Sequence, residues 1–223
     1  MSFPFELDHV VIFSRIDAPE AQILESLGLK GFGGITRHGD LGTASTSFFF
    51  EHHYLELFWV QDEPAASKSL TPLGFDLHSR IAWRETRASP FGVMFCRPES
   101  VKVPVPFPTR QLRAEWMPGE VYVDFAADVS AEPYYGVLPS ELTYPAFKSN
   151  ITERSHALGI KELSGVRFTV TGTELSPIAR LLSANGPVAI QTGASPLMEL
   201  IFDAGVQGKT LDIRPTLPLV LTY

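Results

Sequence analysis

Hydrophobic residues occur along the chain in short runs separated by polar, glycine-rich or proline-rich turns, a pattern typical of many strands and few helices. Three runs near the start are rich in β-branched and aromatic side chains and predict strands: 5–13, 43–50 and 53–60. Between the first two, Ile23, Leu24 and Leu27 recur at helical spacing. Pro19 before this segment and Gly28 after it therefore predict a helix over 18–28.

A similar order recurs in the last third of the chain. Residues 165–171 predict a strand, and Ser176-Pro177 begins a helix that ends at Asn185-Gly186. Two further strands are expected at 187–192 and 197–203. The segments YLELF at 54–58 and LMELI at 197–201 are alike, and each ends its series, which indicates an internal structural repeat.

The middle of the chain is less regular. We expect a short helix around Leu77–Arg84, an irregular stretch over 132–150, and strands at 91–96, 111–117 and 120–126. Four prolines between 98 and 108 exclude a central strand or a helix there and favour an extended surface segment. The repeated strand–helix–strand order, with more strand than helix, predicts the α+β class.

Composition and charge narrow the classes of protein that fit. The 223 residues are 44% hydrophobic and 19% charged, which is typical of a globular chain. A net charge of −7 argues against nucleic acid as a partner, because phosphate backbones are repelled. No apolar run is long enough to cross a membrane. The single cysteine, Cys96, and the lack of a signal-peptide pattern predict a cytoplasmic location.

The predicted strand at 53–60 divides its side chains between two faces, because alternate residues of a strand share a face. One face carries His52, Tyr54, Glu56 and Phe58, and the other carries His53, Leu55, Leu57 and Trp59. The second face is expected to pack on the 18–28 helix. A carboxylate in an apolar strand is unfavourable unless it is paired, solvated or bound to a cation. Glu56 is therefore expected either in a polar cavity or on a face exposed to water.

His9 lies in the equally apolar strand over 5–13. A lone histidine in a strand is more often a hydrogen-bonded core residue than a metal ligand. Together with Glu56 on a neighbouring strand, however, it would supply half of a site for a divalent metal ion. The sequence alone leaves both interpretations open.

Several short motifs follow one another along the chain in an order and at a spacing similar to those of a known superfamily. They are Leu7-Asp8-His9-Val10-Val11, Gly33-Gly34, His38, Leu41-Gly42-Thr43 and Tyr54-Leu55-Glu56-Leu57, with weaker matches at 155–163 and 212–215. In this order they resemble the vicinal oxygen chelate superfamily, which comprises glyoxalase, bleomycin resistance and extradiol dioxygenase proteins. The resemblance is strongest to its bacterial glyoxalase-like domain branch.

The resemblance implies paired βαβββ modules that form a half-open barrel, or cup. The first module would span 1–62, and the second would span 63–223 with a proline-rich insertion, in one compact domain. In metal enzymes of this superfamily the ligands come from the first and last strands of each module. By analogy, His9 and Glu56 are ligand candidates in the first module, and Glu199 is the candidate in the second.

The chain also departs from the family pattern. The strand at 165–171 offers Val166, Arg167 or Phe168 where a histidine ligand is expected, and Ser45 replaces a frequent asparagine. The expectation for a cofactor is therefore one divalent metal ion of unknown identity or none. We predict that His9, Glu56 and Glu199 converge in one cavity, and that Glu56 and Tyr54 face the inside of the cup.

Six side chains are candidates for binding a ligand: His38, His52, Tyr54, Phe58, Trp83 and Arg167. Aromatic rings would stack on a ring-shaped molecule, and the Arg167 guanidinium would pair with a carboxylate. The alternatives are ordinary core aromatics, an exposed loop for His38, and a salt bridge at the rim for Arg167.

Two functions remain open. The first is a glyoxalase-like, metal-assisted lyase, isomerase or dioxygenase acting on a small molecule with vicinal oxygens, with Glu56 and Glu199 as catalytic residues. The second is a metal-free small-molecule binding protein of the sequestration or resistance type on the same scaffold. A small molecule is the expected partner in both cases, and a homodimer stays open.

Overall fold

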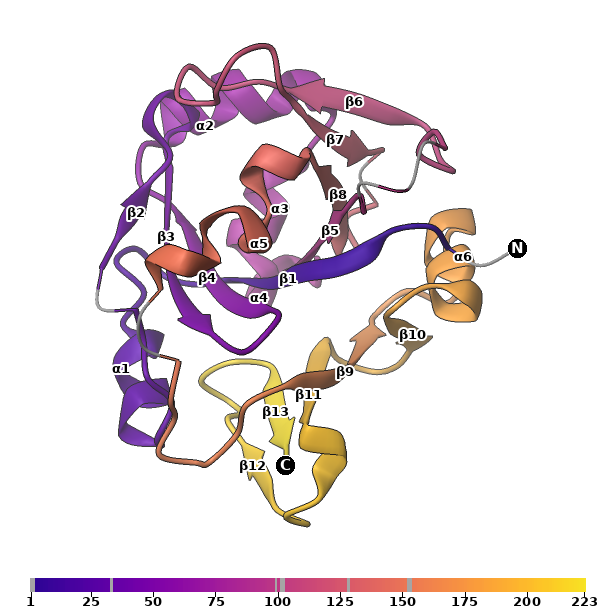
Figure 1. Ribbon diagram of the computed structural model, residues 1–223. Helices are drawn as coiled ribbons and strands as arrows, with labels where there is room; N and C mark the ends of the chain where they lie inside the picture. Colours follow the sequence, from indigo (N-terminus) through magenta and orange to yellow (C-terminus); the bar gives the residue numbers. More distant parts are fainter. Residues whose placement is uncertain (1–2, 33, 99, 101–102, 128, 152–153) are drawn as a thin grey trace.

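The computed structural model describes residues 3–32, 34–98, 100, 103–127, 129–151 and 154–223, so Gly33 of the Gly33-Gly34 motif lies outside it. The chain has an α+β fold with an eight-stranded and a five-stranded sheet. The larger sheet curls around a central space without closing, and the smaller sheet lies below it in the view of Figure 1. This arrangement confirms the expected cup.

The larger sheet contains eight strands: β1 (Glu6–Phe13), β2 (Thr36–Arg37), β3 (Thr43–Phe49), β4 (Tyr54–Val60), β5 (Phe91–Cys96), β6 (Thr109–Leu112), β7 (Val123–Ala126) and β8 (Tyr134–Leu138). Its order is β2-β3-β4-β1-β5-β8-β7-β6. At its centre β1 pairs antiparallel with β5, while β4 runs parallel to β1 and β8 runs parallel to β5. The strands β1–β4 and β5–β8 thus form two halves with matching strand order.

The second half of the cup therefore comes from 91–138 rather than from the later copy of the LEL segment. In chain order, the connection between β5 and β6 contains no helix among its described residues, whereas α1 (Glu20–Ser26) connects β1 to β2 in the first half. The central strand β8 falls in a stretch expected to be irregular, because its five residues include Gly136 and lie between Pro133 and Pro139. Tertiary pairing with β5 and β7 makes it a strand.

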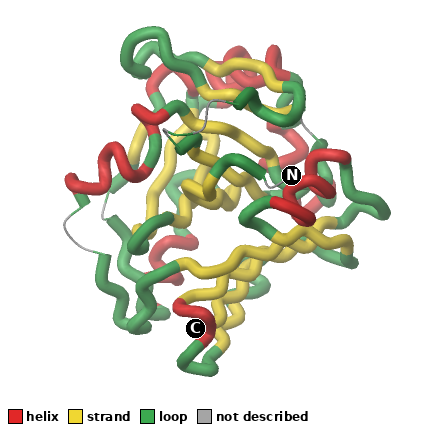
Figure 2. Tube along the Cα trace, turned by 45° about the vertical axis from the view of Figure 1, so that its right-hand side comes forward, coloured by secondary structure: helices red, strands yellow, loops and turns green. Residues whose placement is uncertain are grey.

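The smaller sheet contains β9 (Leu163–Val170), β10 (Ala189–Thr192), β11 (Leu197–Phe202), β12 (Thr210–Asp212) and β13 (Leu219–Thr222). Its order is β10-β9-β11-β13-β12. Helix α6 (Pro177–Asn185) begins as expected, since the Ser176 side chain accepts a hydrogen bond from the Ala179 N–H. The LMELI segment is thus β11 of the smaller sheet, which lies outside the cup (Figure 1). Figure 2 shows the strands of this lower sheet from a second direction.

Short helices and 3₁₀ turns connect the strands. Within the cup these are η1 (Gly39–Leu41), α2 (Glu63–Leu70), η2 (Thr71–Leu73), α3 (Leu77–Ile81) and α4 (Trp83–Thr86). Between the two sheets in chain order come η3 (Ser140–Leu142), α5 (Tyr144–Phe147) and η4 (Lys148–Asn150), and η5 (Asp203–Gly205) belongs to the smaller sheet. The expected helix around Leu77–Arg84 is divided between α3 and α4. Within the described part of the chain, no helix is long and apolar enough to cross a membrane.

The main hydrophobic core lies between the convex face of the larger sheet, α1 and the smaller sheet. Leu55, Leu57 and Trp59 are buried there in one cluster with Leu24 of α1 and Phe202 of β11. This confirms the expected division of faces along 53–60. The opposite face of β4 is consequently left to the inside of the cup, where the candidate site is found.

Candidate functional site

The inside of the cup holds a cavity of about 520 Å³, within the usual range for small-molecule sites. Most of its lining is aromatic or aliphatic. The lining residues are His9, Phe32, Gly34, Thr36, Arg37, His38, Leu41, Thr43, Ser45, Ser47, Phe49, Tyr54, Glu56, Phe58, Leu70, Leu73, Phe75, Met94, Leu112, Trp116, Met117, Val123, Phe125, Tyr134, Leu138, Glu141, Leu142, Phe147 and Ile151.

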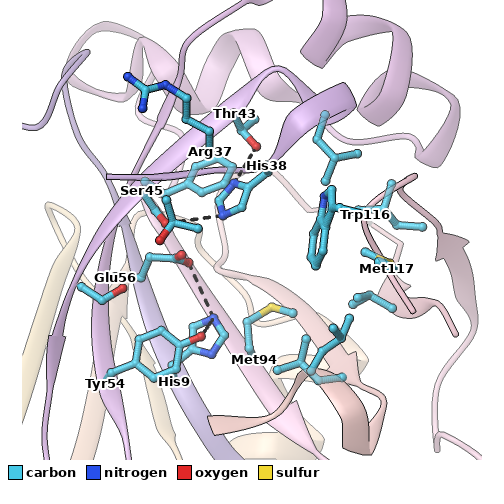
Figure 3. Close-up of a pocket in the computed structure, with 18 of the residues that line it drawn as sticks. His9, Arg37, His38, Thr43, Ser45, Tyr54, Glu56, Met94, Trp116 and Met117 are labelled. Carbon is cyan, nitrogen blue, oxygen red and sulfur yellow. Dashed lines mark hydrogen bonds and ion pairs between the residues drawn. The ribbon is translucent and has the colours of Figure 1, made fainter. Parts of the chain in front are cut away.

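The pairing of β1 with β4 brings the polar residues of this cavity together. These parallel strands place His9 opposite Tyr54 and Val11 opposite Glu56. Because alternate residues share a face, Tyr54 and Glu56 both point into the cup beside His9 (Figure 3). The prediction that Glu56 and Tyr54 face the cup is therefore confirmed.

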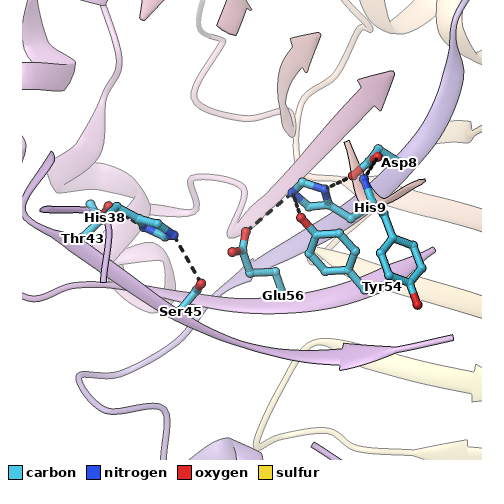
Figure 4. Close-up of polar contacts among 8 residues, drawn as sticks. Asp8, His9, His38, Thr43, Ser45, Tyr54 and Glu56 are labelled. Carbon is cyan, nitrogen blue, oxygen red and sulfur yellow. Dashed lines mark hydrogen bonds and ion pairs between the residues drawn. The ribbon is translucent and has the colours of Figure 1, made fainter. Parts of the chain in front are cut away.

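His9 is the centre of a buried polar network (Figure 4). Its Nδ1 lies 2.6 Å from Asp8 Oδ1, while the other Asp8 oxygen accepts a hydrogen bond of 2.7 Å from the Tyr144 N–H. On the cavity side, His9 Nε2 lies 3.4 Å from the Tyr54 hydroxyl and 3.6 Å from Glu56 Oε2. The Asp8 carboxylate accepts only, so it places the neutral ring's proton on Nδ1 and leaves the Nε2 lone pair toward the cavity.

Two phenols border this network. The ring of Tyr54 stacks on His9 with centroids 4.1 Å apart, and Tyr134 lines the cavity from β8. Burial, and next the charge of Glu56, raise the pKa of Tyr54 and of Tyr134 well above the usual value. Both phenols therefore stay protonated and can donate hydrogen bonds.

His38 forms a second polar group further along the same wall. Its Nδ1 lies 2.9 Å from Thr43 Oγ1, its Nε2 lies 3.5 Å from Ser45 Oγ, and its ring stacks near Phe58. Burial lowers the pKa of His38, so the ring is neutral at pH 7. The structure thus places His38 and Phe58 in the cavity rather than in an exposed loop or the core.

The remaining sequence candidates lie elsewhere. Glu199 on β11 and Arg167 on β9 face each other in the smaller sheet, with Glu199 Oε2 3.5 Å from Arg167 Nη1. His52 lies in the exposed turn before β4, and Trp83 of α4 packs beneath the Arg84 guanidinium. None of these four lines the cavity.

The expected convergence of His9, Glu56 and Glu199 is therefore wrong. The strand that matches β4 in the second half of the cup is β8, not β11, because β8 runs parallel to β5 as β4 runs parallel to β1. The cavity-facing positions of β5 and β8 carry Met94, Tyr134 and Leu138. They offer no imidazole or carboxylate to complete a ligand set.

A divalent ion in this cavity would be held by His9 Nε2 and Glu56 Oε2. Catalytic zinc sites commonly use three protein ligands. In the described ranges, no three histidine, cysteine or acidic side chains are grouped to hold a metal ion. The donor set therefore does not fit the metal centre that the family resemblance implies, and the chemistry considered below uses the side chains alone.

Sequence analysis missed several residues of the site. Asp8 directly precedes His9 in the sequence, so it could have been proposed as the hydrogen-bond partner of a buried histidine. Met94 and Tyr134 carried no comparable signal, because only the pairing of the two halves brings them to the cavity.

Comparisons with known proteins bear on the fold alone. No family model and no curated protein matches the chain. Among solved structures, a hypothetical protein from Staphylococcus aureus matches with a TM-score of 0.56 and 12% identity, covering 97% of this chain and 98% of that one. This similarity spans the cup and the smaller sheet together.

Two further solved structures show weaker similarity. The hypothetical protein BH1468 from Bacillus halodurans C-125 has a TM-score of 0.34 and 18% identity over 61% of this chain and 94% of that one. A mutant of 4-hydroxymandelate synthase from Streptomyces coelicolor has a TM-score of 0.40 and 12% identity over 100% of this chain and 62% of that one.

Proposed function

We propose that the chain is an enzyme of the glyoxalase-like lyase or isomerase kind that transfers a proton on a small molecule bound in the cup. The observation that carries the proposal is the position of His9, with Asp8 behind its Nδ1 and the cavity before its Nε2. A buried imidazole held in one tautomer by a carboxylate is a common general base.

The chemistry follows from the groups around Nε2. His9 takes a proton from a carbon next to a carbonyl of the bound molecule, and the electron pair moves onto the carbonyl oxygen. The resulting imidazolium lies between Asp8 and Glu56, which stabilise its positive charge. The phenols of Tyr54 or Tyr134 donate a hydrogen bond to the enolate oxygen. Return of the proton to a neighbouring atom completes an isomerisation.

The apolar part of the cavity serves binding. Its walls from β5, β6, β7, β8 and α2 carry leucine, valine, methionine and phenylalanine side chains. Burial of an apolar body against them stabilises the complex by roughly 25 cal/mol per Å² of apolar surface. The polar wall of β1, β3 and β4 then orients the reacting group toward His9.

A library of aromatic and alicyclic carbonyl compounds, screened by ligand-observed NMR in D₂O, tests the proposal. We expect compounds that bind also to exchange a carbon-bound proton for deuterium, and the exchange to be lost in His9→Gln while binding persists. Exchange that continues at the wild-type rate in His9→Gln would remove His9 from this role.

The second candidate is a metal-free binding protein of the sequestration or resistance type. It is favoured by the predominantly apolar lining and by the Tyr54 hydroxyl, which already contacts His9 Nε2. Binding without deuterium exchange in the same experiment would support this candidate instead of the enzyme.

A further inference from the structure

The charges at the polar end of the cavity do not balance. Asp8 and Glu56 are two carboxylates that share a single imidazole, His9, and all three side chains are largely buried, with 0%, 13% and 7% of their surface exposed. With His9 protonated this triad carries one net negative charge, and with His9 neutral it carries two. Net charge in a low-dielectric site is unfavourable unless a counter-ion compensates it.

The surrounding protein supplies little compensation. The only other charged side chains that line the described cavity are Arg37 and Glu141, both exposed. The Arg37 guanidinium points away from Glu56 (Figure 3). Buried Arg80 lies behind Tyr134, with its guanidinium carbon 5.8 Å from the centre of that ring, and its side chain donates to the Ser89 and Val129 carbonyls.

The side chains around the triad suit an organic cation. The rings of Tyr54, Phe58 and Tyr134 line the cavity together with Glu56. Aromatic faces attract cations, and a desolvated carboxylate forms a strong charge-assisted hydrogen bond with an ammonium group. An anionic head would instead meet two carboxylates at this end of the cavity.

From this geometry we propose that the natural ligand of the cup is a hydrophobic amine, with its ammonium group at Glu56 and its apolar body against the opposite wall. The inference rests on the proposed use of the cup as a small-molecule site, and it names the class of molecule. A bound monocation reduces the net negative charge of this triad by one, whichever protonation state His9 has.

Three probes of one shape test this inference: 6-phenylhexylamine, 6-phenylhexan-1-ol and 6-phenylhexanoate. Calorimetric titrations are run at pH 7 with a chelator, so that carried-over metal does not occupy Glu56. We expect the amine to bind at least about tenfold more tightly than the alcohol, given the strength of a desolvated cation–π and carboxylate contact. The carboxylate is expected to bind most weakly.

Glu56→Gln removes the charge with little change of shape, so it should reduce the preference for the amine over the alcohol to below about twofold while the alcohol binds as before. Glu199→Gln makes the same chemical change outside the cavity and should keep the full preference. The unchanged alcohol affinity also shows that the Glu56→Gln variant is folded.

Each other outcome is informative. Equal affinity for amine and alcohol, or tightest binding of the carboxylate, overturns the amine inference and leaves the cup as a small-molecule site. Failure of all three probes to bind overturns the amine inference, and absence of binding in the carbonyl screen overturns the proposed function separately.

If Glu56→Gln does not fold, nuclear Overhauser contacts in the wild-type complex with 6-phenylhexylamine show where the ammonium group lies. The methylene beside the ammonium must lie near the Tyr54 and Tyr134 rings, and contact with Trp116 instead overturns the inference.

Discussion

At the residue scale, the orientation of His9 depends on one carboxylate. Asp8 accepts from the Tyr144 N–H with one oxygen and faces His9 Nδ1 with the other. It does not line the cavity and so acts through His9, as a positioning residue. A backbone donor thus holds the carboxylate, the carboxylate holds the imidazole, and the imidazole presents Nε2 to the bound molecule.

Asp8→Asn tests this arrangement. The amide oxygen can still accept from Tyr144, but the amide N–H would donate to Nδ1 and move the ring proton to Nε2. We expect the rate of deuterium exchange on a bound carbonyl compound to fall by about 10²–10⁴, the usual contribution of a general base. The dissociation constant of the compound should change less than about threefold, since no binding contact is lost. An unchanged exchange rate and an unchanged pH profile would contradict the positioning role.

A second residue-scale feature is Gly42 in the Leu41-Gly42-Thr43 motif. Its φ is +63°, and an added Cβ would lie 2.4 Å from the Asp62 carbonyl oxygen and 2.6 Å from the Ala66 nitrogen. The Gly42 carbonyl also accepts from the Gln61 and Asp62 N–H groups. This close approach joins β3 to the start of α2 and holds the wall of the cavity that contains His38.

Gly42→Ala should therefore lower the free energy of unfolding by more than the strain of a left-handed alanine, which is about 1–2 kcal/mol. Gly208→Ala is the matched control, since its φ is +65° and an added Cβ there would meet no atom within 4 Å. Urea denaturation of both variants measures their free energies of unfolding. We expect Gly42→Ala to lose about 1–3 kcal/mol more than Gly208→Ala, because of the overlap with the backbone. Equal losses of unfolding free energy in the two variants would mean that the backbone at Asp62 moves away from the added Cβ without cost.

At the element scale, a buried histidine joins three segments. His156 Nδ1 accepts from the Lys30 N–H at 2.9 Å, and its Nε2 donates to the Phe49 carbonyl at 3.0 Å. The ring therefore connects the segment after α1, the end of β3 and the segment before β9. This bonding pattern requires a neutral imidazole, because an Nδ1–H cannot accept from Lys30.

Burial lowers the pKa of His156, partly offset by the bond to Phe49. The unfolded chain then binds this proton more readily than the folded protein. The contribution to stability is complete above the unfolded pKa of about 6.5 and is lost as pH falls below it toward the folded pKa. Urea denaturation from pH 7.5 to 5 should show decreasing stability, with a shallower decrease in His156→Gln. Parallel profiles for the two proteins would contradict this assignment.

At the scale of the whole molecule, aromatic contacts join the two sheets. Phe50 beside β3 lies 4.6 Å from Phe202 of β11, and Phe91 of β5 lies 5.4 Å from Phe168 of β9, measured between ring centroids. All four rings belong to one buried cluster. The cup and the smaller sheet therefore share a core and are expected to unfold together.

Cooperative unfolding can be measured with probes on either side of this core. All three tryptophans lie at positions 59, 83 and 116, in the cup half of the chain, while methyl NMR signals of Leu200 and Leu221 report on the smaller sheet. Their urea midpoints should coincide. Phe202→Ala should lower both midpoints by the same amount, and the free energy of unfolding should fall by about 3–5 kcal/mol. Separate midpoints would show two independent folding units.

The sequence by itself determined the local features of this protein. Alternation along 53–60 assigned Leu55 and Trp59 to one face and Glu56 to the other, because a strand's faces follow from parity alone. The family resemblance then identified the face of Glu56 with the inside of the cup. The turn chemistry of Ser176-Pro177 likewise placed the start of α6. The α+β class and the cup followed from the order of such elements and from the family resemblance.

Only the tertiary structure decided which strands are neighbours. The LEL segments at 54–58 and 197–201 are alike in sequence, yet β4 lines the cup and β11 belongs to the other sheet. Strand partners are chosen by the burial of whole faces over long sequence separation, which a local pattern does not encode. For the same reason Tyr134 and Met94 joined His9 and Glu56 at the cavity, and Glu199 paired with Arg167 instead.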